Sequence, residues 1–280
     1  MSISWYPGHM AKTRRLIEEN IRQVDAVVEL CDARIPYSSR NPILPELLGN
    51  KPCLLILNKS DMADPAVNSA WVRRFQAQGT LALLCDSISG AGLSEIAPRV
   101  RDLLQEKIRR DEQKGMTRAI KIMVVGVPNV GKSSFINKLS GRKAAKVENR
   151  PGVTRDKQWV RLSGSLDLLD MPGILWPKFE DEEVGYRLAA TGAIKDTILD
   201  TEDVASRLLQ LLRPHYEKEL TERYKITLTE DMTGFTVLEA IGAARGFKIS
   251  GGEIDTERAA KMVLEELRSV KIGRISLERP

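Results

Sequence analysis

The segment from Gly126 to Ser133 has the residue types of a phosphate-binding loop. It reads Gly-Val-Pro-Asn-Val-Gly-Lys-Ser, which fits the pattern G-x-x-x-x-G-K-[ST]. Its glycines would let backbone N–H groups approach phosphates, Lys132 would add a positive charge, and the Ser133 hydroxyl could ligate Mg²⁺. An apolar run at 120–125 precedes the loop and an amphipathic stretch at 134–139 follows it. This order of strand, loop and helix is what phosphate binding requires; the alternative interpretation is a plain glycine turn.

A second polar segment, Asn58-Lys59-Ser60-Asp61, follows the apolar run 53–57. It is therefore expected at the carboxyl end of a buried parallel strand, where open α/β sheets bind ligands. The Asp61 carboxylate could accept hydrogen bonds from the ring N–H and the exocyclic amine of guanine, whereas adenine offers no such donor pair. Asn58 would hold the loop and Lys59 would cover the ring. A strand-end turn without a ligand is the alternative, and pairing with a phosphate loop favours a guanine site.

A third segment, Asp170-Met171-Pro172-Gly173, follows the apolar run 166–169, about forty residues beyond Lys132. D-x-x-G is a common pattern, so its position is what makes it informative. Asp170 would hold Mg²⁺ through water, and the Gly173 N–H would meet the γ-phosphate. Between the phosphate loop and this segment, the Thr154 hydroxyl could complete the magnesium shell when GTP is present. A solvated loop threonine is the other interpretation.

The order of these segments is reversed relative to an ordinary GTPase, because the guanine segment precedes the phosphate loop. Domain termini often lie close together and cuts at exposed loops are tolerated, so a parallel sheet can be permuted without changing which residues meet at the ligand. The chain then leaves the nucleotide-binding part just after Gly173. Residues 174–179 are therefore expected to link the nucleotide state to the downstream chain, with GTP reorienting the tail.

In permuted order, these motifs resemble those of the translation-factor-like GTPases, and the chain is similar over nearly its whole length to the bacterial ribosome biogenesis GTPase A family. The resemblance rests on the opening 5–10 (Trp-Tyr-Pro-Gly-His-Met), Asp32-Ala33-Arg34-Ile35-Pro36, the guanine segment, the phosphate loop, Pro151-Gly152-Val153-Thr154, Asp170 to Gly173 and a helical tail. One departure is Asp86-Ser87-Ile88, where the superfamily usually has Ser-Ala-x. Ser87 can still supply its backbone N–H to the guanine oxygen, while the contact of Asp86 is left open. Other permuted groups have zinc sites, for which Cys31, Cys53 and Cys85 are too few and too widely spaced.

Motifs and resemblance together give one expected set of ligand contacts. GTP contacts are expected from Asn58, Lys59, Asp61, Asp86, Ser87, Asn129, Val130, Gly131, Lys132, Ser133, Ser134, Thr154 and Gly173. Magnesium contacts are expected from Ser133, Thr154 and, through water, Asp170. The resemblance further implies that Asn129 binds K⁺ beside the phosphates; a loop-stabilising asparagine is the alternative.

Hydrolysis needs a group that positions water, and the residue after Gly173 is the apolar Ile174 rather than the frequent glutamine. By resemblance the catalytic candidate is His9, one of two histidines in the chain. A purely structural histidine is the alternative interpretation.

The hydrophobic pattern predicts an α/β fold. Strands are expected at 26–31, 53–57, 81–85, 120–125 and 166–169, with helices at 10–24 and about 93–114. Four helical stretches follow, near 184–194, 204–216, 237–244 and 256–269. We therefore expect a circularly permuted P-loop GTPase domain at 1–175, with a mostly parallel sheet and helices on both faces, followed by a helical RNA- or ribosome-binding domain at 176–280.

Composition bounds the environment and the partners. No apolar run reaches the ~18 residues of a membrane span, and the start lacks a signal-peptide pattern. The three unpaired-looking cysteines suit a reducing compartment. We therefore expect a cytoplasmic monomer without membrane contact. Residues 121–165 contain ten Lys or Arg against two acidic residues, whereas 166–203 contain three against ten. The basic residues beyond Lys132 favour an RNA backbone as partner, with a solvated basic face as the alternative. They are Lys138, Arg142, Lys143, Lys146, Arg150, Arg155, Lys157 and Arg161.

Two functions follow from these expectations. The resemblance implies a GTPase that assists late assembly of the large ribosomal subunit, binds the precursor particle, its rRNA and ribosomal proteins, and leaves after GTP hydrolysis. The alternative is a GTP-gated RNA-binding module, or a GTPase with a non-ribosomal target.

Overall fold

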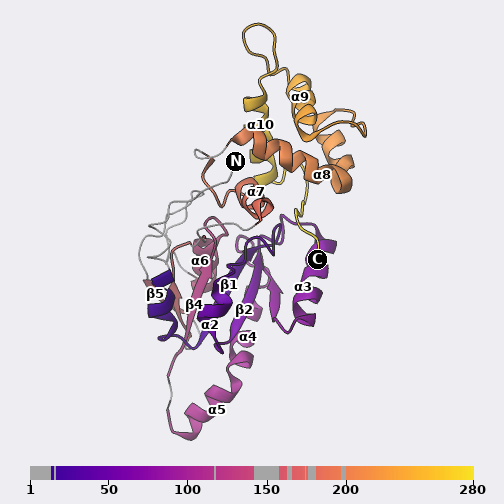
Figure 1. Ribbon diagram of the computed structural model, residues 1–280. Helices are drawn as coiled ribbons and strands as arrows, with labels where there is room; N and C mark the ends of the chain where they lie inside the picture. The colour runs from indigo at the N-terminus through magenta and orange to yellow at the C-terminus, as the bar shows by residue number, and fades with distance from the viewer. Residues whose placement is uncertain are drawn as a thin grey trace.

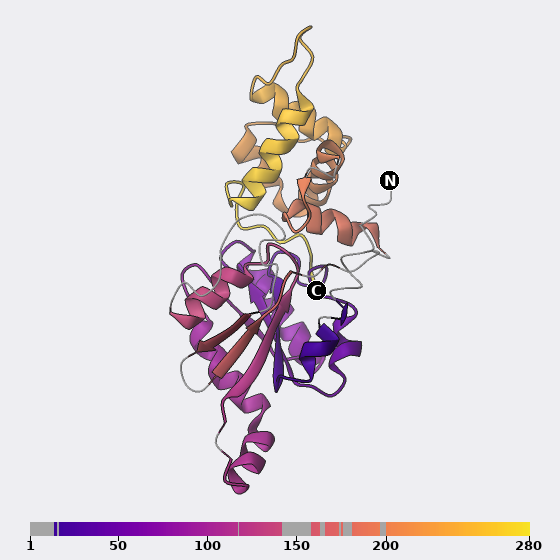
Figure 2. The same cartoon turned by 90° about the vertical axis from the view of Figure 1, so that its left-hand side faces the viewer.

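The computed structural model describes residues 14–15, 17–116, 118–141, 158–162, 166–173, 175, 181–196 and 200–280. His9, Thr154 and Ile174 lie outside these ranges, as do most residues of the predicted basic face. The described chain forms a mixed sheet covered by helices, with a group of further helices packed beyond one end of the sheet (Figure 1). That end is where the parallel strands have their carboxyl termini, as the second view also shows (Figure 2).

Six strands form one sheet in the order β3-β2-β1-β4-β6-β5. The strands are β1 Ala26–Asp32, β2 Cys53–Asn58, β3 Ala82–Leu84, β4 Ile120–Gly126, β5 Gln158–Leu162 and β6 Leu166–Asp170. All neighbours pair in parallel except β5, which runs antiparallel to β6 at the edge. The central strands are nearly continuous apolar runs because helices bury both of their faces.

Helices cover the two faces of the sheet with alternating residues of the same strands. On one face, Val28 of β1 and Val124 of β4 share a core with α4 (Ile96–Leu103) and α6 (Lys132–Ser140). On the other face, Val27 and Met123 pack with Leu44 of α2 (Leu44–Leu48) and with the helical residues 17–21. Farther along that face, Trp71 and Phe75 of α3 (Pro65–Ala77) cover β2. The expected fold class, a mostly parallel sheet with helices on both faces, is confirmed.

The predicted helix near 93–114 is divided in the structure. It consists of a 3₁₀ turn η1 (Leu93–Glu95), α4 and α5 (Gln105–Gln113), with a break at Leu104. Leu104 is buried and has non-helical dihedral angles, φ −105° and ψ 11°. Helix α5 has no buried residue and projects away from the sheet (Figure 1).

The described C-terminal helices match the four predicted stretches. They are α7 Glu182–Ala190, α8 Thr201–Tyr224, α9 Gly234–Ala244 and α10 Thr256–Arg268. Asp181, Asp200, Thr233 and Asp255 cap their first turns, each through a side-chain oxygen that accepts from the backbone. Helix α8 is kinked at Tyr216, two residues after Pro214. In the part of the chain that the structure describes, no helix is both long enough and apolar enough to span a membrane.

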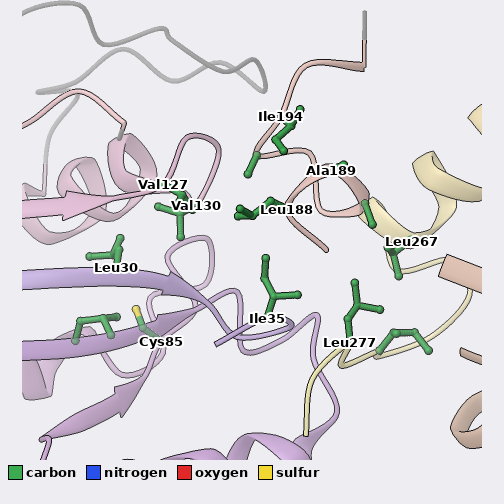
Figure 3. Close-up of a cluster of buried hydrophobic side chains, with 14 of the residues drawn as sticks. Leu30, Ile35, Cys85, Val127, Val130, Leu188, Ala189, Ile194, Leu267 and Leu277 are labelled. Carbon is green, nitrogen blue, oxygen red and sulfur yellow. The ribbon is translucent and has the colours of Figure 1, made fainter. Parts of the chain in front are cut away.

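One hydrophobic core joins the sheet to these helices. Val127 and Val130 of the phosphate loop and Ile35 belong to the same buried cluster as Leu188 of α7 and Leu277. Figure 3 shows these side chains facing one another across the seam between the two parts. The phosphate loop is therefore packed directly against the helices, and the division expected near residue 175 crosses a shared core.

Candidate nucleotide-binding site

The phosphate loop connects β4 to α6 as the sequence predicts. Gly131 precedes α6 with φ +97°, a left-handed conformation that favours glycine. A Cβ at this position would lie 2.5 Å from Asn58 Nδ2, so the approach of the guanine segment also excludes a side chain. No side chain caps the N-terminus of α6. The first-turn amides, including those of Ser133 and Ser134, can therefore serve an anion.

Lys132 and Asp170 are buried side by side under this loop. Lys132 Nζ donates to the carbonyl oxygens of Gly126 at 3.1 Å and Val127 at 3.3 Å. Asp170 ends β6, opposite Val124 of β4. Burial lowers the pKa of Lys132 to about 8, although the Asp170 charge acts in the opposite direction. Burial likewise raises the pKa of Asp170 to about 6, and Lys132 opposes that rise. Both groups are thus poorly solvated charges.

Two further observations indicate that phosphate and a metal ion could bind between Lys132 and Asp170. Among the residues that the structure describes, Asp170 Oδ1 is buried without a hydrogen-bond partner. A Cβ on Gly173 would lie 2.9 Å from Pro128 Cα and 3.1 Å from Lys132 Nζ, so the Gly173 backbone reaches the phosphate loop. Carboxylate and hydroxyl oxygens are the ligands that Mg²⁺ prefers, and the unpartnered Asp170 oxygen fits this donor set.

Asn58 joins three of the predicted segments. Its Nδ2 donates to the Val130 carbonyl at 2.8 Å. Its Oδ1 accepts from Ser87 N at 3.2 Å and from Ser87 Oγ at 2.6 Å. Asn58 therefore ties the loop after β2 to the phosphate loop and to the loop after β3, which places Ser87 at the same edge of the sheet.

Lys59 is held from two sides. Its Nζ donates to the Asn129 carbonyl at 2.6 Å and lies 3.1 Å from Asp32 Oδ2. Asp32 also binds Arg34 through two hydrogen bonds, of 2.9 and 2.7 Å, and all of Arg34 is buried. Burial acts to raise the pKa of Asp32, but the Arg34 and Lys59 charges outweigh it and hold that pKa below its ordinary value. Burial in turn lowers the pKa of Lys59.

The two acidic candidates on the guanine side differ in what surrounds them. Asp61 is largely exposed. The part of it that is buried and the nearby Asp86 charge raise its pKa. Its carboxylate can accept hydrogen bonds from a ligand that presents a pair of donors. The Asp86 carboxylate instead accepts from Ile88 N at 2.8 Å and Ser89 N at 3.2 Å, within its own turn. Asp86 thus stabilises the loop that presents Ser87.

The Asn129 side chain faces the helices. Its Nδ2 donates to the Gly192 carbonyl at 3.2 Å, just beyond α7. Arg268 of α10 donates to the Ala189 and Ala190 carbonyls at 2.8 and 3.0 Å and pairs with Asp196. The phosphate loop is therefore linked by hydrogen bonds to the C-terminal turn of α7.

Sequence reasoning missed two contributors to this site. Asp32 enters the sequence prediction only as part of a family motif, yet it ends the buried strand β1, as Asn58 ends β2 and Asp170 ends β6. Gly192 had no local signal, because its contact with Asn129 depends on packing 63 residues along the chain. No group of three or more potential metal-ligating His, Cys, Asp or Glu side chains occurs within the described ranges.

Comparisons with known proteins agree with this geometry. Residues 121–237 match the family model described as 50S ribosome-binding GTPase. The chain is 49% identical to ribosome biogenesis GTPase A of Priestia megaterium, covering 100% of this chain and 98% of that protein. It is 35% identical to mitochondrial ribosome-associated GTPase 1 of Mus musculus, over 98% and 90% of the two chains.

Solved structures with a similar fold also come from GTPases of this kind. The structure of GNP-bound YlqF from T. maritima aligns with a TM-score of 0.67 at 26% identity, covering 96% of this chain and 98% of that one. A GDP-bound YlqF structure aligns with the same TM-score at 27% identity, covering 95% and 99%. With full-length relatives at this identity and the guanine segment ahead of the phosphate loop, the chain belongs to the ribosome biogenesis GTPase A family and is a circularly permuted GTPase.

Proposed function

We propose that this GTPase is a molecular switch in late assembly of the large ribosomal subunit, binding immature particles and rRNA and leaving after GTP hydrolysis. The observation that most supports a switch is the convergence of Lys132, Asp170 and Gly173 with the guanine segment at one edge of the sheet. The ribosomal context comes from the relatives, which are named as a ribosome biogenesis GTPase and a ribosome-associated GTPase.

In this proposal, GTP spans the carboxyl ends of β2 and β4. Lys132 and the amides of Gly131, Ser133 and Ser134 bind the phosphates, and Gly173 meets the γ-phosphate. Asp61 accepts from guanine, with Lys59 over the ring and Ser87 N toward its oxygen. The two solved relatives are GDP-bound and GNP-bound structures, which supports a guanine nucleotide here.

Metal ions complete the proposed site. Ser133, Thr154 and, through water, Asp170 would hold Mg²⁺, for which the unpartnered Asp170 oxygen is the supporting observation. Mg²⁺ neutralises negative charge on the phosphates as they react. We assign K⁺ to Asn129 on family resemblance, and its amide nitrogen already binds Gly192.

Water activation is assigned to His9. Ile174 follows Gly173 in the place of a water-orienting glutamine and has no polar group to replace it. An imidazole can accept a proton or orient water near neutral pH.

The RNA-facing surface is proposed near β5. Trp159 is 42% exposed, the Lys121 ammonium lies 5.5 Å from its ring centre, and the Arg161 side chain is 78% exposed. Exposed aromatic rings beside basic groups suit stacking and phosphate contacts with RNA. We also propose residues 1–175 as the GTPase domain and 176–280 as the ribosome-binding helical domain, in a cytoplasmic monomer.

The switch has a direct structural route to the helices. Asn129 bonds to Gly192, and Val127 and Val130 share a core with Leu188 of α7. A change in the phosphate loop on nucleotide binding would therefore alter the packing of α7 without passing through residues 174–179.

Sucrose-gradient sedimentation with large-subunit precursor particles tests the proposal. Co-sedimentation is expected with a non-hydrolysable GTP analogue and is expected to fall with GDP. The particles are expected to raise GTP turnover, and K⁺ is expected to support more turnover than Na⁺. Equal binding in all nucleotide states, or no preference for GTP over ATP, would refute the switch.

Variants separate the assigned roles. His9→Ala should retain GTP binding and lose particle-stimulated turnover, while His215→Ala, which replaces the other histidine of the chain on the exposed side of α8, should leave both unchanged. Asn129→Ala should remove the difference between K⁺ and Na⁺. Unchanged turnover in His9→Ala would exclude His9 from the reaction.

A further inference from the structure

The chain segment after α10 crosses back from the helices to the sheet. Figure 1 shows this segment, in yellow, leaving α10 and ending beside α3. Ile275, Ser276, Leu277 and Glu278 are all at least 93% buried. We call these four residues the C-terminal strap. It was not expected from the sequence, which predicted only helices in this part of the chain.

The strap is bound to the loop that follows β1. Leu277 N donates to the Arg34 carbonyl at 2.8 Å. The Glu278 carboxylate accepts from Tyr37 N at 2.6 Å and from Ser38 N at 2.9 Å, and also from the Ser38 hydroxyl. A buried carboxylate that receives several N–H and O–H donors holds their backbone firmly, because each bond to a charged acceptor is strong.

The strap is also bound to the loop that follows β2. Ile275 N donates to the Met62 carbonyl at 3.1 Å, and Asp64 N donates to Ser276 Oγ at 3.1 Å. Trp71 Nε1 of α3 donates to the Glu278 carbonyl at 3.2 Å. One four-residue segment therefore fixes two loops that are otherwise separate in the sequence.

These two loops are the ones that lead to the guanine side of the site. Met62 directly follows Asp61. Arg34 binds Asp32, and Asp32 holds the Lys59 ammonium. Neither loop has another described segment of the C-terminal part bonded to its backbone in this way. The strap thus helps to hold Lys59 and Asp61 in place, together with the Asn129 carbonyl that binds Lys59 and the Cys85 carbonyl that accepts from Ser60 N.

We propose that the C-terminal strap positions the guanine-binding loops, with Glu278 as its positioning residue, so that recognition of the base depends on the tail. This inference rests on the proposed assignment of Lys59 and Asp61 to guanine. In this proposal the strap acts by holding the two loops, and not by contact with the nucleotide.

The other side of the strap is tied to the kink in α8. Tyr216 OH accepts from Ser276 N at 3.0 Å and lies 3.3 Å from the Ser276 carbonyl, to which it donates. Tyr216 is the residue at which α8 departs from helical dihedral angles. Because coupling between sites is reciprocal, guanine nucleotide binding should in turn stabilise the docked strap and its contact with α8.

The test compares GDP with inosine diphosphate, which lacks the exocyclic amine that Asp61 would accept from, and with inorganic tripolyphosphate. Titration calorimetry in Mg²⁺ measures all three affinities for the full chain. Glu278→Ala should weaken GDP binding about tenfold and reduce the preference for GDP over inosine diphosphate. Tripolyphosphate binding should not change, because it uses the phosphate loop alone.

Two further variants make the test specific. Glu278→Gln retains an acceptor oxygen and should restore part of the GDP affinity. Glu253→Gln, at an exposed position between α9 and α10, is the matched control and should bind all three ligands as the wild type does. If Glu278→Ala does not fold, Ser276→Ala, which removes the acceptor of Asp64 N, replaces it with the same expected pattern.

The outcomes distinguish this inference from the function on which it rests. Equal losses for GDP, inosine diphosphate and tripolyphosphate, or unchanged GDP affinity in a folded variant, would overturn the positioning role while leaving the GTPase proposal intact. A wild-type protein that does not prefer GDP over ADP would refute the guanine site and the strap's role in it together.

Discussion

An isosteric change at the end of β6, Asp170→Asn, is expected to stabilise the protein when nucleotide and Mg²⁺ are absent. Burial raises the pKa of Asp170 from its ordinary 3.8 to about 6. That difference corresponds to about 3 kcal/mol of unfavourable free energy for the ionised carboxylate in the folded state. This cost already includes the opposing attraction of Lys132, so asparagine removes it in full, but the buried amide N–H donors of asparagine need new partners. We therefore expect a net gain of about 1–2 kcal/mol in the free energy of unfolding near neutral pH.

The pH dependence of the stability difference tests whether the buried charge of Asp170 is its cause. Because the pKa is higher in the folded than in the unfolded state, protonation of Asp170 favours folding, and this contribution is lost as the pH rises through about 6. Wild type and variant should therefore be closest in stability near pH 4, where the carboxyl is protonated in the folded state and about half protonated in the unfolded state. The variant should become the more stable protein as the pH approaches about 7.5.

Urea denaturation followed by intrinsic fluorescence, in EDTA at both pH values, measures the difference. Asp167→Asn is the matched control, because it lies on the same strand with its side chain 20% exposed and paired with Arg161. That change should alter stability by less than about 1 kcal/mol, without the same pH trend. An Asp170→Asn variant that is less stable than wild type near pH 7.5 would show that the buried pair stabilises the fold, contrary to our reasoning.

Two other changes test the contacts around the site. Asp32→Asn leaves the buried Arg34 guanidinium without a full counter-charge and should lower the free energy of unfolding by about 3 kcal/mol, as urea titration would show. Because it also releases Lys59, GDP affinity should fall, measured by calorimetry. Asn129→Ala removes the bond to Gly192 and places alanine at φ +57°, so a loss of about 1–2 kcal/mol is expected. Hydrogen exchange of the amides at 188–194 should become faster.

Controls for these two changes come from exposed positions. Asp102→Asn affects only an exposed pair with Arg99 and should change stability by less than about 0.5 kcal/mol. Asn50→Ala, at an exposed site between α2 and β2, should leave exchange at 188–194 unaltered. If Asn129→Ala exchanges at the wild-type rate in that segment, the bond to Gly192 does not couple the phosphate loop to α7.

Much of the sheet could be predicted because its signal is local. Four of the five predicted strands, all but the edge strand β3, are largely buried apolar runs, and polar site residues such as Asn58 and Asp170 end two of them. The carboxyl ends of parallel strands meet at one edge, so their side chains had to converge. β5 was missed because it is an edge strand in which only Val160 and Leu162 are buried.

Contacts across the seam could not be predicted from local pattern. Asn129 meets Gly192 and Glu278 meets Ser38 only after the helices have packed on the sheet. Similarly, the break at the buried Leu104 lies within residues 103–107 (Leu-Leu-Gln-Glu-Lys), which all favour a helix, so local propensity does not predict it. The sequence indicates which residues line the strand ends, and tertiary packing decides what holds them.

The strap also bears on the order in which the molecule can be completed. Ser38 and Glu278 are 240 positions apart, so during synthesis the loop after β1 emerges long before its partner exists. Closing so large a loop costs chain entropy, and this cost is offset only when almost all other contacts have formed. A nascent chain whose strap is still inside the ribosome would thus have a formed phosphate loop, but its guanine-binding loops would not yet be held in position. Nucleotide binding to such a chain would be weak.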